Sequence, residues 1–217
     1  MTDDGSETNG EWPATMGQLL GDLLDEYETF TGQSIDRRDY AELKRAIDTD
    51  VVPIAEADRS FFVLGSYGKA EEARLRLVAD RLDAVGKPFL LKDLGGFDDL
   101  LLWTTQFKVM ANRATHIVGL YEHSEGGHEW EAGWLDHEPY RSKLTVLKRD
   151  YPDLDPTEEP FDGMFAHFLE SLAALGQMHR FDAATEASAS EIERGVKAAV
   201  REYKADLLGE LPPQRRT

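Results

Sequence analysis

Residues 123–131 bring together histidines, glutamates and glycines, the residue types that handle protons, sugars and metal ions. This loop follows an apolar run at residues 116–120 and leads into a helix-like segment that contains Glu131. A carboxylate placed there can attack or stabilise a sugar carbon while a glycosidic bond breaks. We therefore predict Glu131 as the catalytic carboxylate, His128 as the group that protonates the leaving base, and Gly127 as a ligand contact.

Two other interpretations of the same loop remain open. Histidine and glutamate also ligate metal ions, but His128 and His137 are nine residues apart and the chain contains no HExxH motif. We therefore predict neither a metal site nor a cofactor. Alternatively, Glu129 and Glu131 only stabilise the start of a helix, where the helix dipole favours negative charge.

Two earlier loops also follow apolar runs and carry polar side chains. Ser66, Tyr67 and Gly68 open a helix-like segment after the first run, and a helix N-terminus favours an anion such as a phosphate. Asp93 follows the next run and is placed to accept hydrogen bonds from ribose-type hydroxyls. We predict all four residues as ligand contacts. An ordinary turn between a strand and a helix is the alternative at both loops.

These loops need a framework of alternating strands and helices. Short, continuously apolar runs between helical periodicities are typical of parallel strands that are buried on both faces. We predict strands at residues 61–65, 89–91, 116–121, 144–147 and 178–181. We predict helices at residues 16–30, 36–49, 70–85, 97–112, 130–135, 165–175 and 190–208. A capping box formed by Ser188 and Glu191 marks the start of the last helix.

The fold class that follows is α/β, with a flavodoxin-like parallel sheet of four to five strands flanked by helices and preceded by a two-helix arm. Residues 1–13 are polar and acidic, which predicts a disordered tail. Residues 14–58 form the helical arm, which packs against the domain or assembles a homo-oligomer. Residues 59–210 form the α/β domain, and residues 211–217 form a frayed tail.

The 217-residue chain is strongly acidic, with 42 Asp and Glu against 24 Lys and Arg and a net charge of −18. High salt screens the repulsion between the negative charges of such a chain. We therefore predict that the protein is located in the cytoplasm of a salt-loving archaeon. The alternative is an acidic protein from an ordinary cytoplasm. The charge argues against nucleic acid as a partner. The sequence contains no cysteine, no secretory signal, and no run of about 18 apolar residues that would place it in a membrane.

The layout resembles the nucleoside 2-deoxyribosyltransferase-like superfamily, whose relatives include TIR domains that cleave NAD. The resemblance covers residues 60–208 and is carried by residues 61–68, 124–134 and 178–208, with Glu131-Ala132-Gly133-Trp134 at the position of the superfamily's glutamate. It implies N-glycosidic bond cleavage or transfer on a nucleoside, a nucleotide or an NAD-like molecule.

In this superfamily the glutamate acts at C1′ of a ribosyl or deoxyribosyl group, which implies the same role for Glu131. The resemblance also implies ligand contacts for Ser66, Tyr67 and Asp93. The third apolar run ends in Tyr121-Glu122-His123, where the superfamily is usually rich in Asp. A non-catalytic nucleotide-sensing or protein-interaction module of the same fold is the alternative.

Overall fold

The computed structural model describes residues 36–95, 103–123, 127–155, 158, 160–161 and 163–209, together with residues 17, 20, 21, 24, 25, 28 and 29. The chain forms two compact units, one from residues 1–53 and 94–109 and the other from residues 54–93 and 110–217. The predicted tails at residues 1–13 and 211–217 lie outside the described residues.

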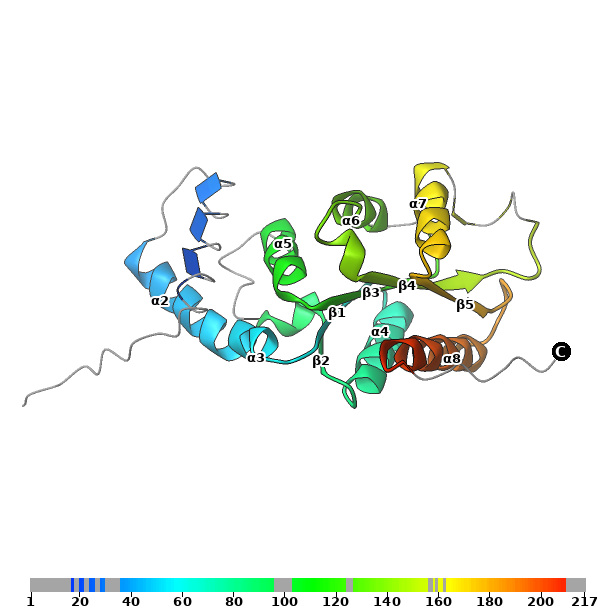
Figure 1. Ribbon diagram of the computed structural model, residues 1–217, viewed down its shortest axis with the longest axis horizontal. Helices are drawn as coiled ribbons and strands as arrows, with labels where there is room; N and C mark the ends of the chain where they lie inside the picture. Colours follow the sequence, from blue (N-terminus) through cyan, green and yellow to red (C-terminus); the bar gives the residue numbers. More distant parts are fainter. Residues whose placement is uncertain are drawn as a thin grey trace, which may run out of the picture. The chain divides into compact units, whose positions relative to one another are not determined.

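The second unit contains a five-stranded, fully parallel sheet with the strand order β2-β1-β3-β4-β5 (Figure 1). The strands are β1 (Ser60–Gly65), β2 (Lys87–Phe89), β3 (His116–Tyr121), β4 (Leu144–Asp150) and β5 (Met178–Asp182). This order is the flavodoxin-like one, so the predicted fold class is confirmed. All residues of β1, and all but the first of β3, are buried, which explains why both strands are apolar throughout.

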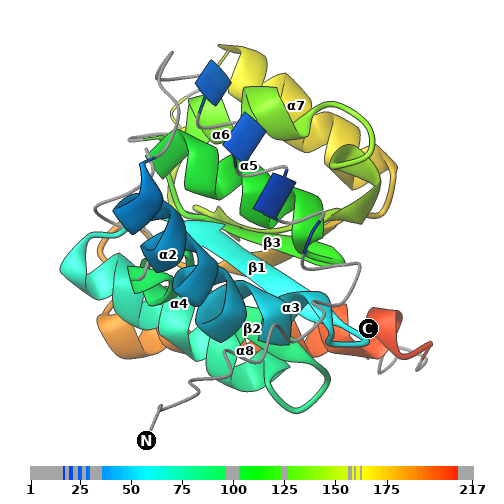
Figure 2. The same ribbon diagram turned by 90° about the vertical axis from the view of Figure 1, so that its left-hand side faces the viewer.

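Helices cover both faces of this sheet. Figure 1 shows α6 (His128–Leu135) and α7 (Gly163–Ala174) on one face, with α4 (Lys69–Leu82) and α8 (Ala189–Leu207) on the other. The same two layers are visible in the view of Figure 2. A parallel sheet needs such cover on both faces, because its strands bury side chains in both directions.

The core beneath α4 and α8 is built from alternate residues of the strands. Phe61 and Val63 of β1 pack there with Leu75 and Val78 of α4 and with Val196 of α8, and all five are at most 1% exposed. Alternation along a strand sends every second side chain to the same face. The helical spacing of the other three residues places them on the inner faces of their helices.

Local signals in the sequence account for two element boundaries. The capping box is confirmed, because the Ser188 side chain accepts from the Glu191 backbone N–H while the Glu191 side chain accepts from Ser188. The second strand was predicted at residues 89–91, but β2 lies two residues earlier. The Leu90 N–H donates to Asp93 Oδ2 at 2.8 Å, and the chain turns there into a short 3-10 helix, Leu91–Asp93.

The first unit contains the helical arm. Its helices are α2 (Arg37–Ala46), a π-helical turn (Ile47–Val51) and α3 (Val52–Ala55), whose last two residues belong to the second unit. The helical spacing of Tyr40, Leu43 and Ile47 predicts that they share one inner face, but only Leu43 and Ile47 are fully buried and Tyr40 is 39% exposed. The described residues of the predicted helix at 16–30 are helical. Helix α5 (Trp103–Arg113) contributes residues to both units.

Candidate functional site

The carboxyl ends of β1 and β3 form the topological switch point of the sheet. The two strands are neighbours, with Gly65 paired to Leu120. The helix after β1 covers one face of the sheet and the helix after β3 covers the other face (Figure 1). Ligands of open α/β sheets bind in the crevice that such a divergence creates. The predicted residues Tyr67 and Glu131 follow these two strands, so the fold brings their loops to one edge.

Glu131 lies in the first turn of α6, where its backbone N–H donates to the Gly127 carbonyl at 3.0 Å. The residue is half-buried, but its Oε2 atom is inaccessible and has no hydrogen-bond partner among the described residues. Burial disfavours the charged form and raises the pKa of the carboxyl from 4.5 to about 7. Gly127 lies close by, since a Cβ there would be 3.9 Å from Glu131 Oε1.

Two tyrosines experience the charge of this carboxyl. Burial raises the pKa of Tyr67 and of Tyr121, and the charge of Glu131 adds to the rise for both. Tyr121 is the last residue of β3 and is fully buried, with its ring 5.3 Å from that of Phe165. Both phenols are therefore protonated at neutral pH and can act as hydrogen-bond donors.

A network of charged side chains also contacts Tyr67. Lys92 Nζ is 4.9 Å from the centroid of the Tyr67 ring and 2.8 Å from Glu72 Oε2. The attraction of this ammonium to the ring face helps to hold the tyrosine in place. Tyr67 therefore contacts a cation from the loop after β2 and is close enough to Glu131 for the charge of that carboxyl to raise its pKa.

Asp93 reaches the same edge, but its two oxygens already accept hydrogen bonds. Oδ1 pairs with the Arg76 guanidinium of α4, and Oδ2 accepts from the Leu90 N–H. These contacts attach the loop after β2 to the first turns of α4. The structure therefore gives Asp93 a structural role, and its predicted contact with a ribose hydroxyl stays a prediction.

The remaining predicted residues are placed only in part. Ser66 is half-buried directly after β1, and Gly68 is the N-cap of α4. Gly127 is the N-cap of α6. His128 is the first residue of α6, but its side chain and residues 124–126 lie outside the described part of the chain. The proton donor predicted at His128 is therefore untested.

Sequence reasoning missed a buried ion pair behind the crevice. Arg74 Nε of α4 donates to Glu122 Oε2 at 2.9 Å, and the two residues are 7% and 4% exposed. Arg74 also contacts Glu71 at 3.2 Å, and the Tyr151 hydroxyl donates to the Glu122 carbonyl. Glu122 directly follows β3, so these contacts fix the chain at the point where it enters the candidate site.

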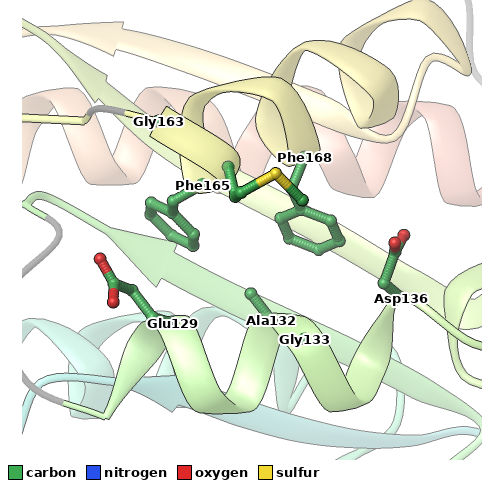
Figure 3. Close-up of a pocket in the computed structure, with 8 residues that line it drawn as sticks. Glu129, Ala132, Gly133, Asp136, Gly163, Phe165 and Phe168 are labelled. Atoms are coloured by element: carbon green, nitrogen blue, oxygen red, sulfur yellow. The ribbon is translucent and has the colours of Figure 1, made fainter.

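A separate groove lies between α6 and α7 (Figure 3). Its volume is about 410 Å³. It is lined by Glu129, Ala132, Gly133, Asp136, Gly163, Met164, Phe165 and Phe168. The α6 residues in this set recur every three to four positions and so share one face of the helix. Glu131 is not among them, and the groove and the candidate site therefore use different faces of α6.

Among the described residues, no group of three or more histidines, aspartates or glutamates is arranged to hold a metal ion. No helix in the described part of the chain is long and apolar enough to cross a membrane.

Comparison with known proteins assigns the chain to a family. No curated protein matches the sequence at a significant level. The profile of a family of unknown function, DUF8170, matches residues 23–207, which include every strand and the candidate site. Because the match covers well over half of the chain, this protein belongs to the DUF8170 family.

Proposed function

We propose that this protein breaks or transfers an N-glycosidic bond of a nucleoside or nucleotide, with Glu131 acting at the sugar carbon. The observation that carries the proposal is the buried Glu131 carboxyl, whose Oε2 has no partner among the described residues, at the crevice of an open α/β sheet. A pKa of about 7 leaves part of this carboxyl ionised at neutral pH. Positive charge that develops on a sugar carbon favours the ionised form further.

The proposed reaction needs a carboxylate and a proton donor. An oxygen of Glu131 bonds to C1′ while the C1′–N bond breaks, and the base leaves with the electron pair of that bond. A general acid, for which we propose His128, protonates the base. Water or a second base then attacks C1′ and releases the carboxylate, which yields hydrolysis or transfer.

The two tyrosines suit the same reaction. Tyr67 is half-buried and its phenol stays protonated, so we assign it as a hydrogen-bond donor to a sugar hydroxyl or a phosphate. Tyr121 is fully buried and near enough to Glu131 for the charge of the carboxyl to raise its pKa, so we assign it to the water-poor surroundings of the carboxyl. A water-poor environment strengthens the attraction between a carboxylate and a cationic sugar carbon.

The test is base release from a panel of nucleosides, deoxynucleotides and NAD, measured by chromatography with the full chain at fixed ionic strength. We expect release by the wild type and a loss of at least about 100-fold in E131Q. E129Q is the matched control, because Glu129 is an exposed glutamate on the same helix and should retain the wild-type rate. Release that continues unchanged in E131Q would remove Glu131 from the reaction.

One observation favours a second function, nucleotide binding without turnover. Many glycosidases use a pair of carboxyl groups, whereas here Asp93 and Glu122 are both held in ion pairs with arginines. If the panel shows no release, calorimetric titration with the same compounds distinguishes the two functions. Binding that weakens in Y67F would then support a sensing module, and the enzymatic proposal would be abandoned.

A further inference from the structure

A second groove lies on the other face of the sheet, where α4 and α8 run side by side (Figure 1). Its volume is about 760 Å³, within the usual range for small-molecule sites. It is lined by Arg81, Val85, Arg194, Lys197, Ala198, Val200, Arg201, Lys204, Ala205 and Leu208. All but the first two of these residues come from α8 and the residue that follows it.

The charge of this groove is opposite to that of the chain. Five of the ten lining residues are basic and none is acidic, although acidic residues outnumber basic ones by 42 to 24 in the whole sequence. Cations gathered in a concave surface focus their field and attract anions. The groove is therefore a local anion-attracting site on an acidic protein.

Three of the five cations are guanidinium groups with no hydrogen bond or ion pair in the described part of the chain: Arg81, Arg194 and Arg201. The two acids that precede Arg194 are engaged elsewhere: Glu193 pairs with Lys197, and Glu191 bonds to the Ser188 cap. Unpaired guanidinium groups have their full capacity left for a ligand.

The two lysines are held in place by the protein. Lys197 pairs with Glu193 at 3.5 Å. Lys204 Nζ donates to the Arg81 carbonyl at 3.0 Å and thereby links α8 to the last turn of α4. The groove thus combines two anchored ammonium groups with the three unpaired guanidinium groups of Arg81, Arg194 and Arg201.

The groove is separate from the Glu131 crevice. A crossover helix runs antiparallel to the strands it connects, so the last turn of α4, with Arg81, lies toward the amino ends of the strands. Helix α6, whose first turn contains Glu131, follows the carboxyl end of β3 and covers the opposite face of the sheet (Figure 1). A ligand in the groove therefore does not compete for the candidate site.

We propose that this groove binds a small molecule that carries two or more phosphate groups. Arginine binds phosphate through two parallel hydrogen bonds, and Arg194 and Arg201 lie about 10 Å apart along α8. Guanidinium groups spread over this distance and contributed by two helices suit a ligand with several anionic groups. Leu208, which is 43% exposed, and Val85 provide an apolar wall for the rest of the molecule.

The test is calorimetric titration of the full chain with inorganic tripolyphosphate, ATP and adenosine at about 0.1 M salt. We expect tripolyphosphate and ATP to bind with a Kd below about 1 mM, and adenosine not to compete with either. Binding of tripolyphosphate alone would identify inorganic polyphosphate as the source, and tighter binding of ATP would identify a nucleotide. The tripolyphosphate result does not depend on the proposed function, because tripolyphosphate contains no sugar.

The charge-reversed double variant R194E/R201E should weaken tripolyphosphate binding at least tenfold. K87E is the matched control, since Lys87 is an exposed lysine outside the groove, and it should leave the Kd unchanged. Circular dichroism of both variants checks that they fold. Equal affinities of R194E/R201E and wild type would overturn the proposal. So would an absence of phosphate binding together with binding of an acidic peptide, which would make the groove a protein-docking surface.

Discussion

Replacing Glu131 by glutamine should make the protein more stable above neutral pH while it removes the proposed activity. The pKa of the Glu131 carboxyl is raised from 4.5 to about 7 by burial, so the folded protein retains a proton that the unfolded chain has lost. Each unit of such a difference is worth about 1.4 kcal/mol. Burial of the ionised carboxyl therefore costs about 3 kcal/mol once both states are deprotonated.

The pH dependence has a definite sign. Between about pH 4.5 and pH 7 the folded state binds more protons at this site than the unfolded state, so the free energy of unfolding falls as the pH rises. Above about pH 7 the full cost is present and the difference no longer changes. E131Q keeps a neutral side chain of similar shape at every pH and does not incur this cost.

Urea unfolding of the wild type and E131Q from about pH 5 to pH 8 measures the effect, since the difference between the two cancels the other titrating groups. We expect an advantage for E131Q of about 1 kcal/mol or less at about pH 5, which grows to about 3 kcal/mol at about pH 8. E129Q, changed at an exposed position of the same helix, serves as the control. If E131Q is no more stable than the wild type at pH 8, the carboxyl is not buried at a cost and the reasoning fails.

Two further substitutions test the framework of the site. G65A should lower the free energy of unfolding by about 1–3 kcal/mol, because Gly65 has a φ of 155° and a Cβ there would lie 2.9 Å from the Leu120 carbonyl oxygen. G95A is the control, because a Cβ at Gly95 would have no atom within 4 Å. Equal melting temperatures of the two variants would contradict the prediction. R74A should lower the free energy of unfolding, measured in urea, by about 3–5 kcal/mol, because it leaves the buried Glu122 carboxylate without its cation. A decrease under about 1 kcal/mol would show that the pair is not buried.

The fold could be predicted because each strand carries its own signal. The run at residues 116–121 is apolar throughout and β3 is buried at all but its first residue, so composition and burial agree. β4 was predicted to end at Leu147 but continues to Asp150, where it pairs with β5 up to Asp182. Lys148 and Arg149 are buried in that strand, and a pattern of apolar residues alone cannot include them.

The partners of the charged residues could not be predicted, because they are distant in the sequence. Asp93 pairs with Arg76 and Glu122 with Arg74, and neither pairing follows from helical spacing or from a motif. The role of each carboxylate depends on its partner. A carboxylate that an arginine neutralises is a structural group, whereas one without an arginine is a candidate ligand contact. Glu131 could be named from the sequence, but the lack of a partner for its Oε2 atom among the described residues could not.

The magnitude of the burial cost bears on one interpretation of Glu131 that the sequence leaves open, the stabilisation of a helix start. An acidic residue in the first turn of a helix gains about 0.3–1 kcal/mol from the helix dipole when it is exposed. The raised pKa of this carboxyl corresponds to a cost of about 3 kcal/mol in its ionised form, so stabilisation of the α6 start does not account for burying it. Glutamine would fill the same space without that cost. We propose that a ligand compensates for this cost when it is bound, a role that the developing positive charge of a sugar carbon can fill.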